Sequence, residues 1–197
     1  MDDALKYFHD FINNSATNQT PVRIKGGGTK DFYGLKLEGD VLNTKQFSGI
    51  VDYEPSELVL TARAGTKLSE IEDALSIEKQ ILPFEPPHFG KNATFGGCIA
   101  AGFSGPRRAY TGSTRDFVLG IRMMNSLGQD LSFGGQVMKN VAGYDLSRLI
   151  TGSFGTLGLI LETSIKVLPL PDAEKSIQFQ YDEKKAINKM NELANQS

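Results

Sequence analysis

The apolar residues near the N-terminus recur at the spacing of one helix face, which predicts an amphipathic helix over about residues 3–13. These residues are Leu5, Phe8, Phe11 and Ile12. Residues 21–25 then alternate apolar and polar side chains, as a half-buried strand does, and they run directly into three glycines. The pattern therefore predicts a helix followed by a strand that ends in a glycine loop.

Three short strands are predicted next, at residues 41–44, 49–53 and 58–62. A second amphipathic helix follows, because Leu68, Ile71, Ala74 and Leu75 fall on one face. Thr66 or Ser69 is suited to cap this helix, and Glu72 stands three residues after Ser69 as a capping box requires. Strands and helices thus alternate, which predicts an α/β unit over about residues 1–78.

From residue 81 to residue 112 the chain is rich in glycine, proline and small residues, a composition that allows it to lie against something flat. Strand-like runs return at residues 117–124, 129–133 and 157–168, and the first two are joined by a turn at Asn125-Ser126-Leu127-Gly128. A short helix is expected at residues 145–151. Residues 79–171 are therefore predicted to form a second subdomain that is mainly sheet.

Beyond Pro169-Leu170-Pro171 the pattern starts again, with a strand-like segment at residues 176–181 and a helical segment at residues 183–195. One strand and one helix bury little surface by themselves. We therefore expect residues 172–197 to be the start of a truncated second domain after the 1–171 domain.

Composition narrows the possible chemistry. A net charge of -2, with 21 basic and 23 acidic residues interspersed, argues against binding of nucleic acid. One cysteine (Cys98), two histidines and the lack of a signal peptide or apolar span predict a cytoplasmic protein without a zinc site or direct membrane insertion. The hydrolase pattern G-x-S-x-G is also absent.

The first glycine cluster, Gly26-Gly27-Gly28-Thr29-Lys30, follows a strand. Successive glycines can turn their N–H groups toward one point and so make a concave site for an anion such as diphosphate. The sequence lacks both the P-loop and the G-x-G-x-x-G patterns, which disfavours the common NTP and NAD sites. A simple turn is the alternative for this cluster.

Two further glycine clusters occupy residues 94–105 and 152–160. Small residues let a ligand approach the main chain closely, although tight packing of two strands is an alternative for residues 94–105. Three such loops in one small domain predict an extended, flat ligand.

Six segments, in order, resemble the FAD-binding domain of the vanillyl-alcohol-oxidase class, also called the p-cresol-methylhydroxylase type. They are KGGGTK, YEPSELVLTARAGTKLSEIEDAL, FEPPHFGKNATFGGCIAAGFSGPRR, GSTRDFVLGI, FGGQVMKNVAGYDLSRLITGSFGTLG and KVLPLP. SGPRR and VMKNVAGYDLSRL are most similar to the FAD-binding subunits of bacterial glycolate oxidases. The resemblance covers about residues 20–171, and six ordered motifs are more specific than any one of them.

The resemblance implies a mixed α/β fold of two subdomains with FAD in the cleft between them. The residues that it assigns to FAD are Gly26, Gly27, Gly28, Thr29, Lys30, Thr94, Gly96, Gly97, Ser104 and Ile160. Two of these have simpler readings, because Lys30 could be a solvated surface charge and Gly96 could serve only a turn. Family members that bind FAD covalently use histidine, or histidine with cysteine. His88 is expected to be a satisfied polar residue, so we predict non-covalent FAD.

Other polar residues are expected to be structural. Arg107 and Arg108 could bind a substrate carboxylate, but a surface pair that meets neighbouring acids or a partner subunit is favoured. The polar residues of KNVAGYDLSR are likewise expected to form a structural network rather than a catalytic one. They are Lys139, Asn140, Tyr144, Asp145 and Arg148.

The activity implied by the resemblance is oxidation of a 2-hydroxy acid such as glycolate to glyoxylate, by hydride transfer to the flavin. The implied partners are a second flavin-type subunit and an iron–sulfur subunit, with any membrane contact made through them. The family takes much of its acid–base machinery from the following domain, so no catalytic residue is assigned and the chain alone is expected to be inactive. A non-catalytic electron-relay or scaffold subunit, or a phosphate-binding module that has lost FAD, are the alternatives.

Overall fold

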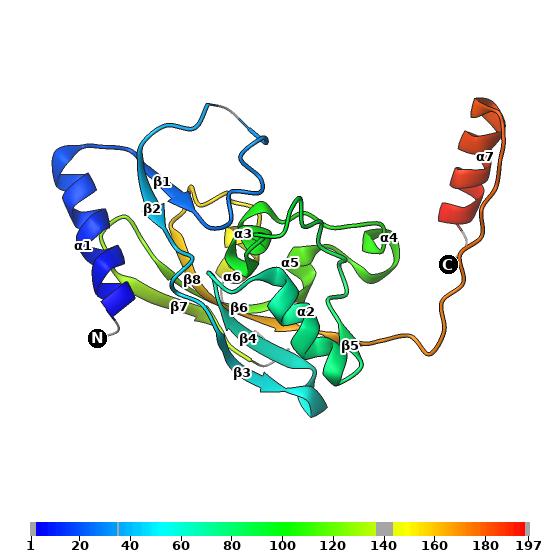
Figure 1. The fold of residues 1–197 in the computed structure, drawn as a ribbon, viewed down its shortest axis with the longest axis horizontal. Coiled ribbons are helices and arrows are strands. Elements are labelled where there is room, and N and C mark those ends of the chain that lie inside the picture. Colours follow the sequence, from blue (N-terminus) through cyan, green and yellow to red (C-terminus); the bar gives the residue numbers. More distant parts are fainter. Residues whose placement is uncertain (1–2, 35, 137–143, 196–197) are drawn as a thin grey trace.

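The computed structural model describes residues 3–34, 36–136 and 144–195. Its centre is an antiparallel five-stranded sheet with the strand order β3-β4-β8-β6-β7 (Figure 1). The strands are β3 (Ile50–Glu54), β4 (Val59–Arg63), β6 (Val118–Met124), β7 (Asp130–Gly134) and β8 (Leu159–Lys166). The predicted turn between β6 and β7 is confirmed, because the Gly128 N–H donates to the Asn125 carbonyl over 3.1 Å.

Two small sheets accompany the central one. β1 (Val22–Lys25) pairs in parallel with β2 (Asp40–Asn43), and the first glycine cluster lies in the connection between them. β5 (Gln80–Ile81) pairs with β9 (Leu168–Pro169) in an antiparallel direction. The predicted strand at residues 21–25 is therefore confirmed, and its glycines follow directly on its carboxyl end.

Short helices pack on the central sheet and form the main hydrophobic core with it. They are α2 (Leu68–Ile77), α3 (Phe95–Ala101), α5 (Thr114–Phe117) and α6 (Leu146–Ile150). Alternate strand residues such as Leu60, Ala62 and Ile121 face this core, as the period of a strand requires. The short helix predicted at residues 145–151 is thus present as α6.

A smaller core joins α1 (Asp3–Asn18) to the β1–β2 pair and to the other side of the sheet (Figure 1). Phe8 and Ile12 of α1 are buried there beside Leu42, Phe47 and Leu161. The helix extends past the predicted end at Asn13 to Asn18, and Gln19 leaves it with a φ of 55°.

The central sheet combines strands from both sides of the predicted boundary at residue 78. β4 lies before that boundary and β8 lies after it, and the two pair along their length, from Val59 opposite Lys166 to Arg63 opposite Glu162. A single sheet therefore links the two segments, since strands far apart in sequence share the same hydrogen bonds.

One local prediction and one of the alternatives are wrong. α2 begins at Leu68 after Lys67 and has no side-chain cap, so Ser69 and Glu72 do not form a capping box. The Thr66 hydroxyl instead contacts the Arg63 carbonyl at 2.7 Å. Residues 94–105 contain the helix α3, which Thr94 caps, so the alternative of two packed strands does not hold there.

The C-terminal segment extends away from the sheets (Figure 1). The predicted strand at residues 176–181 is absent, and these residues are exposed without a partner strand to complete their backbone hydrogen bonds. The predicted helix is present as α7 (Glu183–Ala194), and it buries none of its side chains. The remaining elements are η1 (Pro55–Glu57) and α4 (Arg108–Thr111).

Candidate functional site

A cavity of about 500 Å³ opens where the first glycine cluster meets α3 and the start of β8. It brings together the three glycine clusters that the sequence singled out. The predicted site residues that line it are Gly26, Gly27, Gly28, Thr29, Lys30, Thr94, Gly96, Gly97 and Ile160. Residues separated by more than a hundred positions in sequence therefore share one cavity.

Ser104 is the predicted site residue that does not line this cavity. Its Oγ lies 3.0 Å from the Thr114 Oγ1 and also accepts a hydrogen bond of 3.0 Å from the Thr114 N–H. These contacts tie the end of the second glycine cluster to the start of α5. Ser104 thus has a structural role that sequence reasoning did not indicate.

The main chain of the first glycine cluster offers unused hydrogen-bond donors. Within the part of the chain that the structure describes, the amide N–H groups of residues 26–30 donate to no protein acceptor. Residues 26–30 are partly buried, and their N–H groups are free of protein acceptors, so a ligand that displaces water from the cavity would find these donors available. Several consecutive donors on one loop suit the oxygens of a phosphate or diphosphate.

Packing explains why glycine occupies these positions. A Cβ on Gly27 would stand 1.7 Å from the Asn92 carbonyl oxygen, and a Cβ on Gly26 would stand 2.4 Å from the Thr94 Oγ1. Gly28 has a φ of +69°, in the left-handed region where residues with a Cβ are strained. The loop is thus seated directly on residues 92–94, at the start of α3.

The second glycine cluster forms the part of the cavity wall next to the first. The Thr94 Oγ1 caps α3 by accepting a hydrogen bond of 3.3 Å from the Gly97 N–H. A Cβ on Gly96 would meet the Ala64 Cβ at 2.5 Å, so α3 packs against the end of β4 at a distance that only glycine permits. Gly96 therefore serves helix packing as well as the cavity.

Lys30 is half-buried rather than a solvated surface charge. Burial lowers the pKa of its ammonium group, and the nearby Cys98 opposes that shift. The Lys30 Nζ lies 5.9 Å from the centre of the Phe89 ring, a cation–π distance. A desolvated ammonium beside unused amides strengthens the attraction of the cavity for an anion.

Sequence reasoning missed several charged residues that line the cavity. Arg23 and Lys25 of β1, Asp31 just after the glycines, and Lys36 all lie on its wall. The signal was available, since residues 23 and 25 alternate with apolar neighbours in the strand that enters the glycine loop.

Aromatic side chains crowd the entrance of the cavity. Tyr33 and Phe154 line it and stack on each other at 5.3 Å between ring centres, with only 10° between their planes. Phe103 contacts both rings edge-on, and Phe89 and Phe32 continue the cluster outward. These rings come from loops that are distant in sequence, so no local pattern could indicate the cluster.

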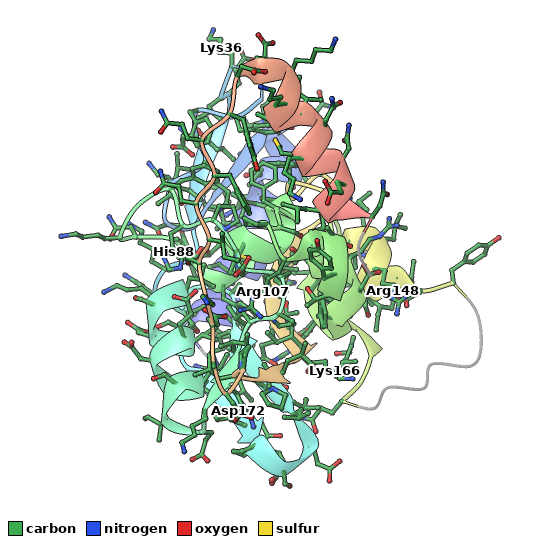
Figure 2. All side chains as sticks on the ribbon, turned by 90° about the vertical axis from the view of Figure 1, so that its right-hand side faces the viewer. Lys36, His88, Arg107, Arg148, Lys166 and Asp172 are labelled. Carbon is green, nitrogen blue, oxygen red and sulfur yellow. The ribbon has the colours of Figure 1, made fainter. Side chains whose placement is uncertain are left out.

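Arg107 meets neighbouring acids, as expected, rather than the cavity. Its Nε donates to the Glu85 Oε1 over 2.9 Å, and its Nη2 contacts Glu174 in the C-terminal segment. The hydrogen bond to Glu85 is the main reason that the pKa of Arg107 is raised. Arg108 is exposed. Figure 2 shows Arg107 near the middle of the molecule and Lys36 at one end.

The other polar candidates also have local roles. The His88 Nε2 lies 2.9 Å from the Glu72 Oε1, as a satisfied polar side chain should. Asp145 accepts a hydrogen bond of 3.0 Å from the Arg148 N–H at the start of α6, and Tyr144 is exposed. Lys139 and Asn140 lie outside the described residues.

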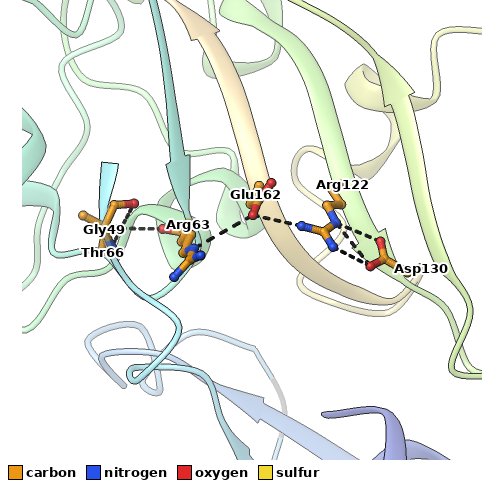
Figure 3. A network of polar contacts seen from close by, with 6 residues as sticks. All are labelled: Gly49, Arg63, Thr66, Arg122, Asp130 and Glu162. Atoms are coloured by element: carbon orange, nitrogen blue, oxygen red, sulfur yellow. Dashed lines mark hydrogen bonds and ion pairs between the residues drawn. The ribbon is translucent and has the colours of Figure 1, made fainter. Parts of the chain in front are cut away.

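A row of charges crosses the sheet on four neighbouring strands (Figure 3). Glu162 of β8 lies 4.0 Å from the Arg63 Nε and 3.0 Å from the Arg122 Nη1. Arg122 also binds Asp130 of β7, with a shortest contact of 2.7 Å. These alternating charges tie β4, β8, β6 and β7 together side by side, which is a structural rather than a chemical function.

Known proteins similar to this chain support a nucleotide-cofactor site in the cavity. The family described as FAD binding domain matches residues 9–134. The chain is 49% identical to glycolate oxidase subunit GlcE of Escherichia coli (strain K12) over 181 residues, which is 92% of this chain and 52% of that protein. It is 35% identical to a D-lactate dehydrogenase of Archaeoglobus fulgidus over 152 residues, which is 76% of this chain and 33% of that protein.

A solved structure shows the same fold. An alkyldihydroxyacetonephosphate synthase superposes with a TM-score of 0.65 at 21% identity, over 85% of this chain and 31% of the other. The chain spans about half the length, or less, of the relatives it matches. Among the described residues, no helix has the length and apolar character needed to cross a membrane. The predicted mixed α/β fold is confirmed, and the chain belongs to the FAD-binding domain family.

Proposed function

We propose that this chain holds non-covalent FAD as part of an oxidoreductase that acts on a 2-hydroxy acid, with glycolate as the first candidate. The observation that carries the proposal is the set of unused amides at residues 26–30, inside a cavity that the three glycine clusters form together. These amides and the Lys30 ammonium would hold the diphosphate of FAD. Thr94, Gly97 and Ile160 line the rest of the cavity and would contact the remainder of the cofactor.

The cavity suits FAD as a binding site. We assign no acid–base role to the residues that line it. Bound FAD would supply hydride acceptance from the carbon that carries the substrate hydroxyl. The chain's own contribution is to bind the cofactor and to hold its diphosphate at the glycine loop. Substrate binding and proton transfer are assigned to the remainder of the enzyme, so the chain alone should not turn over substrate.

The positions of His88 and Cys98 support the proposal that FAD is held non-covalently. His88 is paired with Glu72 and does not line the cavity. Cys98 is buried, and burial raises the pKa of its thiol to about 12, so the nucleophilic thiolate is suppressed. Neither side chain is presented to the cavity as a nucleophile.

The names of two relatives support the choice of substrate, since glycolate and D-lactate are both 2-hydroxy acids. We propose that this subunit works in a cytoplasmic complex with a second flavin-type subunit and an iron–sulfur subunit, and that only these partners would bring it to the inner membrane. A relay or scaffold subunit is a second candidate, because helix α7 buries none of its side chains against the rest of the described chain and leaves them exposed for a partner.

The first experiment is the visible absorption spectrum of the purified chain, followed by acid precipitation. Flavin bands that pass into the supernatant as FAD would support the proposal. A colourless protein that takes up no added FAD would overturn it. Yellow colour that stays in the precipitate would overturn non-covalent attachment.

The catalytic proposal is tested separately in the assembled complex, by reduction of a dye with glycolate and with D-lactate. We expect Gly27→Ala to weaken FAD binding, so that this subunit loses much of its flavin signal and the complex loses most of its glycolate activity. Full activity without this flavin would instead support the scaffold role.

A further inference from the structure

Three charged side chains meet at the mouth of the glycine loop. The Arg23 Nη2 lies 2.6 Å from the Asp31 Oδ2, and the Lys25 Nζ lies 3.9 Å from the same oxygen. Arg23 and Lys25 point to one side of β1 because they are two residues apart on a strand. Asp31 returns to them from the far end of the loop, so one carboxylate oxygen serves two cations.

This cluster lies on the glycine loop itself. A Cβ on Gly28 would stand 3.0 Å from the Lys25 Cε and 3.3 Å from the Asp31 Oδ2. All three charged residues line the same cavity as the unused amides. An anion held by these amides would therefore lie within a few ångströms of both cations and of one carboxylate.

The cluster is only half-shielded from water. The exposed fractions of the Arg23, Lys25 and Asp31 side chains are 22%, 37% and 41%. Exposed ion pairs of this kind contribute little to stability, so a role in folding alone does not explain two cations on one carboxylate at this place. Because these side chains are partly desolvated, a further charge nearby interacts with them more strongly than it would in bulk water.

We propose that Asp31 is a built-in counter-anion that competes with the diphosphate of FAD for Arg23 and Lys25, and so sets how tightly the cofactor is held. This inference rests on the proposed function. The two cations attract the diphosphate, whereas the Asp31 carboxylate repels it and occupies their donors. Asp31 is thus a specificity-determining residue: a ligand with a diphosphate can displace it, and a flavin without phosphate gains nothing from the two cations.

The test compares FAD with riboflavin, which has the same ring system and no phosphate. Asp31→Asn keeps the shape of the side chain and removes only its charge. Asp172→Asn is the matched control, because it makes the same change in net charge in the exposed C-terminal segment, at a residue that does not line the cavity and lies at the other end of Figure 2 from Lys36. Lys25→Gln is paired in the same way with Lys166→Gln on β8, which is outside the cavity.

Binding is followed by flavin fluorescence at low and high salt. We expect Asp31→Asn to tighten FAD binding about three- to tenfold and Lys25→Gln to weaken it about tenfold, with both effects reduced by salt. Riboflavin binding and both control variants should stay at the wild-type values.

Two failures are distinguishable. If the wild-type chain binds no FAD, the proposed function is wrong and this inference falls with it. If the wild-type chain binds FAD but Asp31→Asn leaves its Kd unchanged or weakens it, only the counter-anion role is overturned. Equal shifts for FAD and riboflavin would also overturn it, because they would show a general change in the cavity rather than competition for the diphosphate.

Discussion

The contact between Gly27 and the Asn92 carbonyl provides a sharp test of how the glycine loop is seated. Gly27 lies outside the left-handed region, so alanine could adopt its backbone conformation. The new Cβ, however, would stand 1.7 Å from the Asn92 oxygen, and real Cβ atoms essentially never approach closer than 3.0 Å. The loop and residues 92–94 would have to move apart by about 1.3 Å, because the clash is with backbone and no rotamer relieves it.

The expected cost of Gly27→Ala is about 2–3 kcal/mol in the free energy of unfolding, which is the upper range for overpacking a tight site. FAD affinity should fall further, by about 100-fold, because a shift of about 1 Å misaligns the donor amides with the diphosphate. Urea denaturation measures the first effect, and titration with FAD measures the second.

Gly135→Ala is the matched control, since a Cβ there meets no atom of the described residues within 4 Å and its φ is outside the left-handed region. We expect this variant to match the wild type in both assays. If Gly27→Ala also retained wild-type stability and FAD affinity, the close seating of the glycine loop on residues 92–94 would be refuted.

Three further predictions concern other parts of the molecule. Burial raises the pKa of the Cys98 thiol to about 12, so the free energy of unfolding should fall as the pH rises above 9.0. In urea denaturation at several pH values, Cys98→Ala should reduce this slope by about 1.4 kcal/mol per pH unit. An unchanged slope would contradict the burial of the Cys98 thiol. Glu162→Gln should lower the unfolding free energy by about 1–2 kcal/mol, since it leaves Arg63 and Arg122 without their shared carboxylate. Glu174→Gln should speed tryptic cleavage in the C-terminal segment with less than about 0.5 kcal/mol of global destabilisation; unchanged cleavage would argue against a tether through Arg107.

Local patterns were sufficient for most helices and strands. The helical spacing around Phe8 and Ile12 and the alternation at residues 21–25 depend on which side chains face a core, and that preference is written in neighbouring residues. Local patterns were misleading where the outcome depends on a distant partner. Residues 176–181 have strand-like alternation but no second strand to accept their hydrogen bonds, so no strand forms.

Part of the candidate site could be predicted from the sequence, and part of it depends on the tertiary structure. The glycine clusters and the six ordered motifs identified most of the cavity wall, because close approach of a ligand to the main chain requires small residues in sequence. The pairing of β4 with β8, the sharing of Asp31 between Arg23 and Lys25, and the stacking of Tyr33 on Phe154 join residues that no local rule connects. Such contacts form only when the tertiary structure brings distant segments together. The charged and aromatic side chains that line this cavity therefore could not be placed from the sequence alone.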